Sequence, residues 1–336
     1  MSQVVAEPVA ADQVAVGVGE VEGRTPWQIF WMRFKRDKVA FAGAGFVIIL
    51  ALIAIFAPVI ANNISHHGPN ELLNTPGPNG TVPVPGALSP IGLPSGPSGK
   101  LWFGADQSGR DMFVRTIYGA RTSLIVAVLA TGISVFIGVI LGVIAGFFGG
   151  WVDTVIARTV DIVMSLPLLL FAIGIAAACG TTVQGCSLGF VHLQPGLSVV
   201  VFIIALFNWT YIARIVRGQT FSIREREFVE ASRAAGSNSR RIMFREILPN
   251  LVAPIIVYTT LIIPSNIIFE ASLSFLGVGI PQTTPSWGRM LSDASTYFRV
   301  AWWMMVFPGL FLFLTTLSFN LLGDGLRDAL DPRTGR

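Results

Sequence analysis

Charged residues are scarce in this sequence. Asp, Glu, Lys and Arg make up only 12% of its 336 residues, whereas a soluble globular protein carries roughly a quarter. Hydrophobic residues make up 52%, and the mean hydropathy is +0.66. This composition excludes an ordinary soluble domain and predicts an integral membrane protein.

Three further absences narrow the function. The chain has no G-x-x-x-x-G-K-[ST] sequence, so it cannot bind and hydrolyse ATP through a P-loop, and we expect it to bind no cofactor itself. The adjacent His66 and His67 lack a companion cysteine or acidic cluster, so we expect no metal site. Ser, His and Asp are scattered without the setting of a nucleophile, so we expect no catalytic site and no enzyme.

The few charges are gathered between long uncharged runs. A helix needs about 20 apolar residues to cross the hydrocarbon core of a membrane. The runs therefore predict six crossings in an all-α protein, at about 39–61, 122–148, from Thr154, from Leu197, at 247–269 and at 300–323. Near the inner end of the third crossing, Arg158 and Asp161 predict an ion pair that stabilises the span.

The distribution of Lys and Arg predicts the orientation. With the N-terminus in the cytoplasm, 17 of these residues fall inside and six outside. Because basic residues are retained on the cytoplasmic side, both termini are predicted to be cytoplasmic. The net charge of +4 then reflects membrane topology, and no nucleic-acid partner is expected.

Cysteine occurs only twice, at Cys179 and Cys186 in the second predicted outer loop. A disulfide is permitted outside the cytoplasm, and two free thiols at a membrane boundary are the alternative. Either arrangement would be structural. A mass shift on thiol labelling with and without reductant distinguishes them.

A short amphipathic helix is predicted before the first crossing. Thr25 suits the N-cap and Pro26 the first helical position. The aromatic residues Trp27, Phe30, Trp31 and Phe34 follow at helical spacing with basic residues around them. This stripe predicts a helix in the headgroup layer, in contact with lipid.

The segment "SIREREFVEASRAAGSNSRRIMFREILPN" forms the largest predicted cytoplasmic loop. Ser222 with Glu225 fits a capping box, and Gly236 fits the position after a helix. Ser237 and Ser239 are candidate N-caps of a second helix that leads to Pro249. The loop is therefore predicted to be helix, tight turn, helix.

Three interpretations of this loop compete. A solvated loop would not require two capped helices with small residues on one face. A DNA-binding helix–turn–helix is improbable on a short tether between two crossings. A docking element for a cytoplasmic partner fits best.

One run in the loop resembles the EAA motif, "EAA-x3-G-x9-I-x-LP", of ABC-importer permeases. It comprises Glu230, Ala231, Ser232, Gly236, Ile247, Leu248 and Pro249. Ser232 replaces the third small residue, and Glu246 stands where the pattern often has Ile. The blocks "FGADQSGRDMFVRTIYGARTSL", "ARTVDIVMSLP", "YIARIVRGQ", "EASLSFLGVGI" and "FNLLGDGLRDALDPR" resemble the C-type subunit of the dipeptide/oligopeptide/nickel permeases.

The resemblance implies the type I ABC importer transmembrane fold in a bacterial inner membrane. It also implies four kinds of partner: a homologous second permease, two cytoplasmic ATPase subunits, an extracytoplasmic solute-binding protein and membrane lipid. ATP and Mg would be bound by the ATPase subunits. The EAA loop would be the coupling helix, with Glu230 and Gly236 central.

The resemblance also implies a domain organisation. Residues 1–22 are expected to be a disordered tail, and 23–120 an N-terminal permease region. The latter contains an outer loop with a Pro/Gly-rich insert at 75–99 that is expected to be turn-rich or extended and not to pack on itself. The core transmembrane domain is expected at 121–325 with its coupling loop at 222–249, and a C-terminal cytoplasmic tail at 326–336.

The substrate path is weakly marked. Asn208, Trp209, Tyr211 and Asn266 are polar or amphipathic residues within crossings four and five. They are candidates for lining a translocation pathway, and interhelical hydrogen-bond partners or interface aromatics are the alternative. The expected cargo is a di- or oligopeptide. Import of nickel or another small ligand, and a membrane receptor or scaffold that moves no solute, are the alternative functions.

Overall fold

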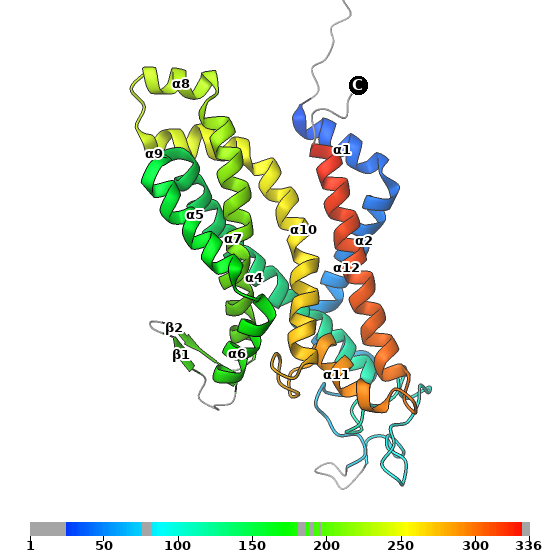
Figure 1. Cartoon of the computed structure of the whole chain (residues 1–336). Coiled ribbons are helices and arrows are strands. Elements are labelled where there is room, and N and C mark those ends of the chain that lie inside the picture. Colours follow the sequence, from blue (N-terminus) through cyan, green and yellow to red (C-terminus); the bar gives the residue numbers. More distant parts are fainter. Residues whose placement is uncertain (1–24, 76–81, 181–185, 189–190, 195, 331–336) are drawn as a thin grey trace, which may run out of the picture.

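The computed structural model describes residues 25–75, 82–180, 186–188, 191–194 and 196–330 (Figure 1). The predicted tail at 1–22 and the last residues of the C-terminal tail lie outside the described residues. The helices are α1 (Pro26–Arg36), α2 (Lys38–Ile55), α3 (Ala57–Ile60), η1 (Ala61–Ser65), α4 (Met112–Phe148), α5 (Gly150–Ser165), α6 (Leu168–Gly180), α7 (Leu197–Arg224), α8 (Glu227–Ala234), α9 (Ser239–Arg241), η2 (Ile242–Ile247), α10 (Leu248–Phe275), α11 (Trp287–Tyr297) and α12 (Trp303–Leu330). The described strands are β1 (Cys186–Leu188) and β2 (Val191–Leu193), which pair as one short antiparallel hairpin. The predicted all-α class is therefore confirmed apart from this hairpin.

In the part of the chain that the structure describes, five helices are each long and apolar enough to cross a membrane: α2, α4, α7, the continuous run Ser239–Phe275, and α12. The remaining predicted crossing, the third along the chain, corresponds to α5 and α6 together, and these two helices meet at an angle of 80°. Pro167 explains the break, since a residue before proline is disfavoured in the helical region, and Leu166 is extended with φ −76° and ψ 131°. Among the described residues, five of the predicted crossings are thus each matched by one apolar helix, and the third is matched by a bent pair of helices.

The second crossing begins earlier than predicted. Helix α4 starts at Met112, not near residue 122, because Asp111 caps it by accepting a hydrogen bond from the backbone N–H of Phe113 at 2.8 Å. Arg115 and Arg121 interrupt the apolar pattern in the first turns of this helix and hide its start in the sequence.

The predicted N-terminal helix is confirmed as α1. The Thr25 hydroxyl accepts from the backbone N–H of Gln28, and the Gln28 side chain accepts from the backbone N–H of Thr25 at 3.1 Å. Phe34 is buried against Ala40 of α2 and Ala329 of α12. Helix α1 therefore packs across the ends of two crossings, and its contact with lipid stays a prediction.

Helices α4 and α7 approach each other closely along a seam of three glycines. Gly138, Gly142 and Gly146 recur every fourth residue on one face of α4. A Cβ added at Gly142 would lie 2.8 Å from the carbonyl oxygen of Ala213 in α7, and one at Gly138 would lie 2.7 Å from Cβ of Ile212. Small residues let two backbones pack at this distance in a membrane, where dispersion contacts replace the hydrophobic effect.

The outer loop packs on itself, contrary to the expectation for its Pro/Gly-rich insert. Leu73, Val84, Ala87, Leu101 and Ala105 form a small buried cluster. The backbone N–H of Val84 donates to the carbonyl of Leu73 at 3.0 Å. Contacts between positions this far apart in sequence are not visible in local composition, which is why the expectation was wrong. Residues 76–81 of the insert lie outside the described residues.

The glycine seam predicts a position-specific effect of added methyl groups. Gly142→Ala is expected to lower the melting temperature of the purified protein in detergent, because overpacking costs about 1–3 kcal/mol. Gly132→Ala is the matched control in the same helix, since nothing lies within 4 Å of its added Cβ. The control is expected to keep or slightly raise the melting temperature, and equal melting temperatures for the two variants would contradict the seam.

Candidate functional site

The charged loop between α7 and α10 forms a compact two-helix projection. Helix α8 lies at the end of the molecule where α12 also ends (Figure 1). After α8 the chain turns, and α9 and η2 then run directly into α10. The predicted order of helix, tight turn and helix is confirmed.

The caps of this loop differ in part from the prediction. Gly236 follows the last residues of α8 with φ +79°, a left-handed conformation that favours glycine, as predicted. The capping box at Ser222 is wrong, because Ser222 lies inside α7 and Arg226 stands at the N-cap of α8. Neither predicted serine caps the second helix. Asn238 does so, and its side chain accepts from the backbone N–H of Arg241 at 2.8 Å.

The loop is anchored to the end of α4 by apolar contacts and one arginine. Val229 of α8 is fully buried in a cluster that includes Phe147, Ile242 and Ile247. Arg224 donates from Nη1 to the carbonyl oxygens of Gly146 at 3.2 Å and Phe147 at 3.3 Å. Cations stabilise the C-terminal end of a helix through these otherwise unpaired carbonyls. This arginine also explains why α7 continues to residue 224, beyond the apolar run.

The residues of the EAA-like run divide between two environments. Glu230 and Ala231 lie on the exposed side of α8, and Gly236 is exposed in the turn that follows. No atom lies within 4 Å of a Cβ added at Gly236. Phe228 on the same helix is a large apolar side chain that is 39% exposed. This face is therefore open to a partner.

The other residues of the run face inward or join the helices. Ile247 is buried beneath the loop, and Leu248 and Pro249 form the first turn of α10. Ser232 is half-buried, and its hydroxyl donates to Oγ of Ser237 at 3.4 Å. One part of the run is thus available for docking and the other connects it to α10. The docking role itself stays a prediction.

Two of the four candidate pathway residues line a cavity. A cavity of about 400 Å³ lies between the α5–α6 bend, α7 and α10. Asn208 and Tyr211 line it, and Tyr258 and Ser265 of α10 join them, which the sequence did not single out.

The other two candidates are placed elsewhere. Asn266 is fully buried and bridges helices: it accepts from the Asn208 amide, and its own amide donates to Oγ1 of Thr131 in α4 at 2.7 Å. Trp209 packs against Val160 of α5. Asn266 therefore has the interhelical hydrogen-bonding role that was the stated alternative, and Trp209 packs between α7 and α5.

The ion pair expected at the third crossing is loose. Arg158 and Asp161 are 4.0 Å apart with both side chains more than half exposed. Asp161 lies nearer to Arg214 of α7, at 3.1 Å. On the same two helices, Arg217 makes a closer contact and donates from Nη2 to Asp153 at 2.7 Å. The pairs that link α5 to α7 are between helices, which sequence spacing alone does not show.

Cys179 is buried at the end of α6 and is not a free thiol. The side chain of Cys186 lies outside the described residues, so the bond between the two cysteines stays a prediction.

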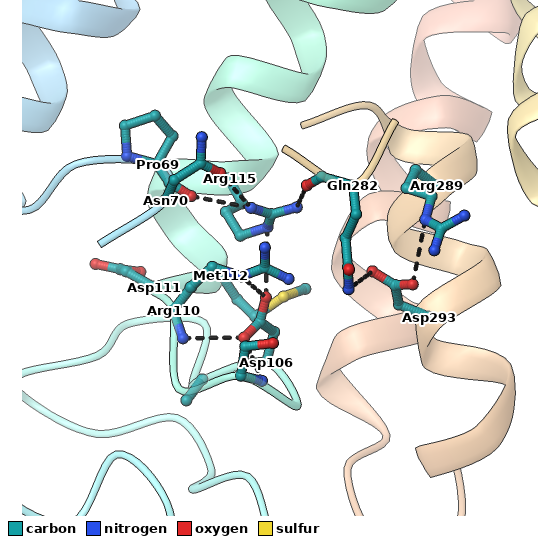
Figure 2. A network of polar contacts seen from close by, with 12 residues as sticks. Pro69, Asn70, Asp106, Arg110, Asp111, Met112, Arg115, Gln282, Arg289 and Asp293 are labelled. Atoms are coloured by element: carbon teal, nitrogen blue, oxygen red, sulfur yellow. Dashed lines mark hydrogen bonds and ion pairs between the residues drawn. The ribbon is translucent and has the colours of Figure 1, made fainter. Parts of the chain in front are cut away.

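A buried polar network at the outer end of the molecule was not predicted (Figure 2). Arg115 is 1% exposed and donates to the carbonyl oxygens of Pro69 at 3.0 Å and Gln282 at 3.2 Å. The Asp106 carboxylate accepts from Nε of Arg110 at 2.6 Å and lies 3.5 Å from Nε of Arg115. The network therefore ties the outer loop to α4 and to the connection between α10 and α11. Its charged members Asp106, Arg110 and Arg115 fall within the block "FGADQSGRDMFVRTIYGARTSL", whose charges were the available signal.

Comparison with family models gives two matches. Residues 138–336 match the family described as binding-protein-dependent transport system inner membrane component. Residues 25–76 match the N-terminal TM domain of oligopeptide transport permease C.

Curated relatives match over almost the whole chain. The glutathione transport system permease proteins GsiD of Escherichia coli O6:K15:H31 (strain 536 / UPEC) and of Shigella boydii serotype 4 (strain Sb227) are each 41% identical over 310 residues. These alignments cover 92% of this chain and 91% of each relative.

The fold matches a solved transporter. An inward-facing structure of the MetNI methionine ABC transporter, in its CY5 native crystal form, aligns with a TM-score of 0.53 at 18% identity. The alignment covers 66% of this chain and 98% of that chain. This likeness confirms the predicted type I importer fold.

The outer network predicts a large cost for removing its central arginine. Arg115→Gln is expected to destabilise the protein by about 1–3 kcal/mol, because the buried carbonyl oxygens of Pro69 and Gln282 lose their donor and Asp106 keeps only Arg110 as a charged partner. Arg121→Gln in the same helix is the control, since Arg121 is exposed. Limited proteolysis of the outer loop measures the effect. Equal protection of the loop in both variants would contradict the role of the network.

Proposed function

Because this chain belongs to the binding-protein-dependent transport system inner membrane components, and is a permease subunit of an ABC importer in the bacterial inner membrane, we propose that its cargo is a short peptide. It forms half of the translocation pathway for that peptide. The exposed face of the Glu230–Gly236 segment couples it to cytoplasmic ATPase subunits.

The continuity from α8 to α10 carries the coupling proposal. Val229 fixes α8 to the end of α4, and η2 runs without a break into α10. Helix α10 in turn lines the cavity through Tyr258 and Ser265. A displacement of α8 by a docked subunit therefore shifts the cavity wall through packed side chains, which are dense and transmit strain.

The chemistry of the cavity supports a peptide as cargo. Asn208, Tyr211 and Tyr258 present neutral hydrogen-bonding groups that suit amide N–H and C=O groups. The curated relatives are permeases of glutathione transport, and the N-terminal match is to an oligopeptide permease.

The partners follow from the family. An ABC importer permease works with a second permease, ATPase subunits and a solute-binding protein. Here we assign ATP and Mg binding to two ATPase subunits, and peptide delivery to a solute-binding protein at the outer loop. The permease itself contributes no chemical step in this scheme.

Gly236 provides a test of coupling. Gly236→Leu is expected to reduce peptide uptake at least about tenfold while ATP hydrolysis by the assembled complex continues, because a bulky side chain would occupy the docking face. Gly236→Ala is the matched control, since it introduces the same left-handed backbone strain, about 1 kcal/mol, without the bulk. ATPase activity and uptake are measured together in proteoliposomes.

If the Gly236→Leu complex couples ATP hydrolysis to peptide uptake as the wild type does, the docking assignment is wrong. The cargo is tested separately, in a strain that lacks the gene. Uptake of labelled dipeptide and of nickel is measured before and after the gene is put back. Restoration of nickel uptake alone would overturn the peptide proposal and leave the coupling role intact.

A further inference from the structure

A second cavity lies on the side of the molecule where α8 is placed. It has a volume of about 660 Å³ and is bounded by α7, α8, α10 and α12. Tyr258 and Leu261 of α10 line this cavity and also the cavity of about 400 Å³ described above. The two residues are three positions apart and so share one face of the helix. The cavities therefore meet at Tyr258 and Leu261.

The two cavities differ in charge. No charged side chain lines the first one among the described residues. The second is lined by Arg226 and Arg327, together with neutral polar residues such as Ser222, and by no carboxylate within the described part of the chain. Both arginines are exposed, and neither makes a hydrogen bond or ion pair to another described side chain. Two guanidinium groups without internal partners thus face one water-accessible space.

We propose that the two cavities form a single exit route, in which Tyr258 and Leu261 are the constriction and Arg226 and Arg327 receive the carboxylate of the departing peptide. The inference rests on the proposed peptide import. A guanidinium binds a carboxylate through two parallel N–H···O bonds, so a pair of arginines favours the free C-terminus of a peptide over its neutral amide.

The position of Arg226 links this site to the coupling loop. Arg226 is the N-cap residue of α8, whereas Arg327 lies in the last turn of α12. A movement of α8 therefore changes the distance between the two guanidinium groups. The carboxylate is held while they converge on it and is released when α8 moves, so that release follows the same displacement as coupling.

Cysteine reactivity from the cytoplasmic face tests the route. The whole complex is studied in inside-out vesicles, and modification is read as a mass shift of this subunit. Ser222→Cys reports on the second cavity and Ser265→Cys on the first, beyond the constriction. Leu261→Trp is expected to slow the reaction of Ser265→Cys about tenfold and to leave Ser222→Cys unchanged, because bulk at the constriction narrows the way to the first cavity and leaves the second open to the cytoplasm.

Charge and ligand dependence test the arginines. An anionic methanethiosulfonate is expected to react with Ser222→Cys about tenfold faster than a cationic one, because two guanidinium groups concentrate anions. Arg226→Gln and Arg327→Gln together should abolish that preference, and Arg240→Gln, on the same loop but outside the cavity, should not. Millimolar Ala-Ala should slow the anionic reaction, whereas its C-terminal amide should not.

Three results would overturn the inference: an unchanged rate for Ser265→Cys with Leu261→Trp, a charge preference that survives loss of both arginines, or equal protection by the acid and the amide. None of these three results contradicts the proposal of peptide import, because that proposal is tested by a separate measurement, the uptake of dipeptide by intact cells. A complex that imports dipeptide but shows any of these results retains its function and lacks this exit site.

Discussion

The close approach of α4 and α7 is the constraint from which the rest of the structure follows. Gly138, Gly142 and Gly146 leave no room for side chains between the two helices, so their backbones pack directly against each other. The seam ends where Arg224 donates to the carbonyls of Gly146 and Phe147 near the end of α4, and the N-cap of α8 follows two residues later. Val229 then closes the loop onto the same helix end. A load applied to α8 is therefore carried directly into the transmembrane bundle.

In the proposed coupling, helix α10 is the element that converts such a displacement into a change of the cavity wall. It continues from a π-helical segment, η2, and contains Pro254 and Pro264 in its interior. Each proline removes a backbone hydrogen bond and allows a helix to bend, and π-helical turns recur at functional positions. The face between these prolines carries Tyr258 and Leu261, which both cavities share. The bendable part of the helix thus coincides with the narrow part of the proposed route.

Features encoded by local chemistry could be predicted from the sequence. Uncharged runs gave the six crossings, and a glycine that tolerates positive φ gave the turn at Gly236. Features that depend on partners distant in sequence could not. The start of α4 could not be predicted because Arg115 looks like a break in the apolar run. Its guanidinium is in fact buried and donates to the carbonyl oxygens of Pro69 and Gln282, which are 46 and 167 positions away in the sequence. Asn208 lines the cavity, whereas its hydrogen-bond partner Asn266 lies behind the cavity wall. This difference likewise depends on how α4, α7 and α10 meet.

The central claim is that the exposed face of α8 is where an ATPase subunit docks and drives this permease. Site-specific photo-crosslinking tests it most directly, with a photoreactive amino acid at Ala231 on that face and, as the control, at Trp102, which is exposed on the outer loop. The account predicts a covalent adduct with the ATPase subunit from position 231 and none from position 102. An assembled, transport-active complex without an ATPase adduct at position 231 would contradict it.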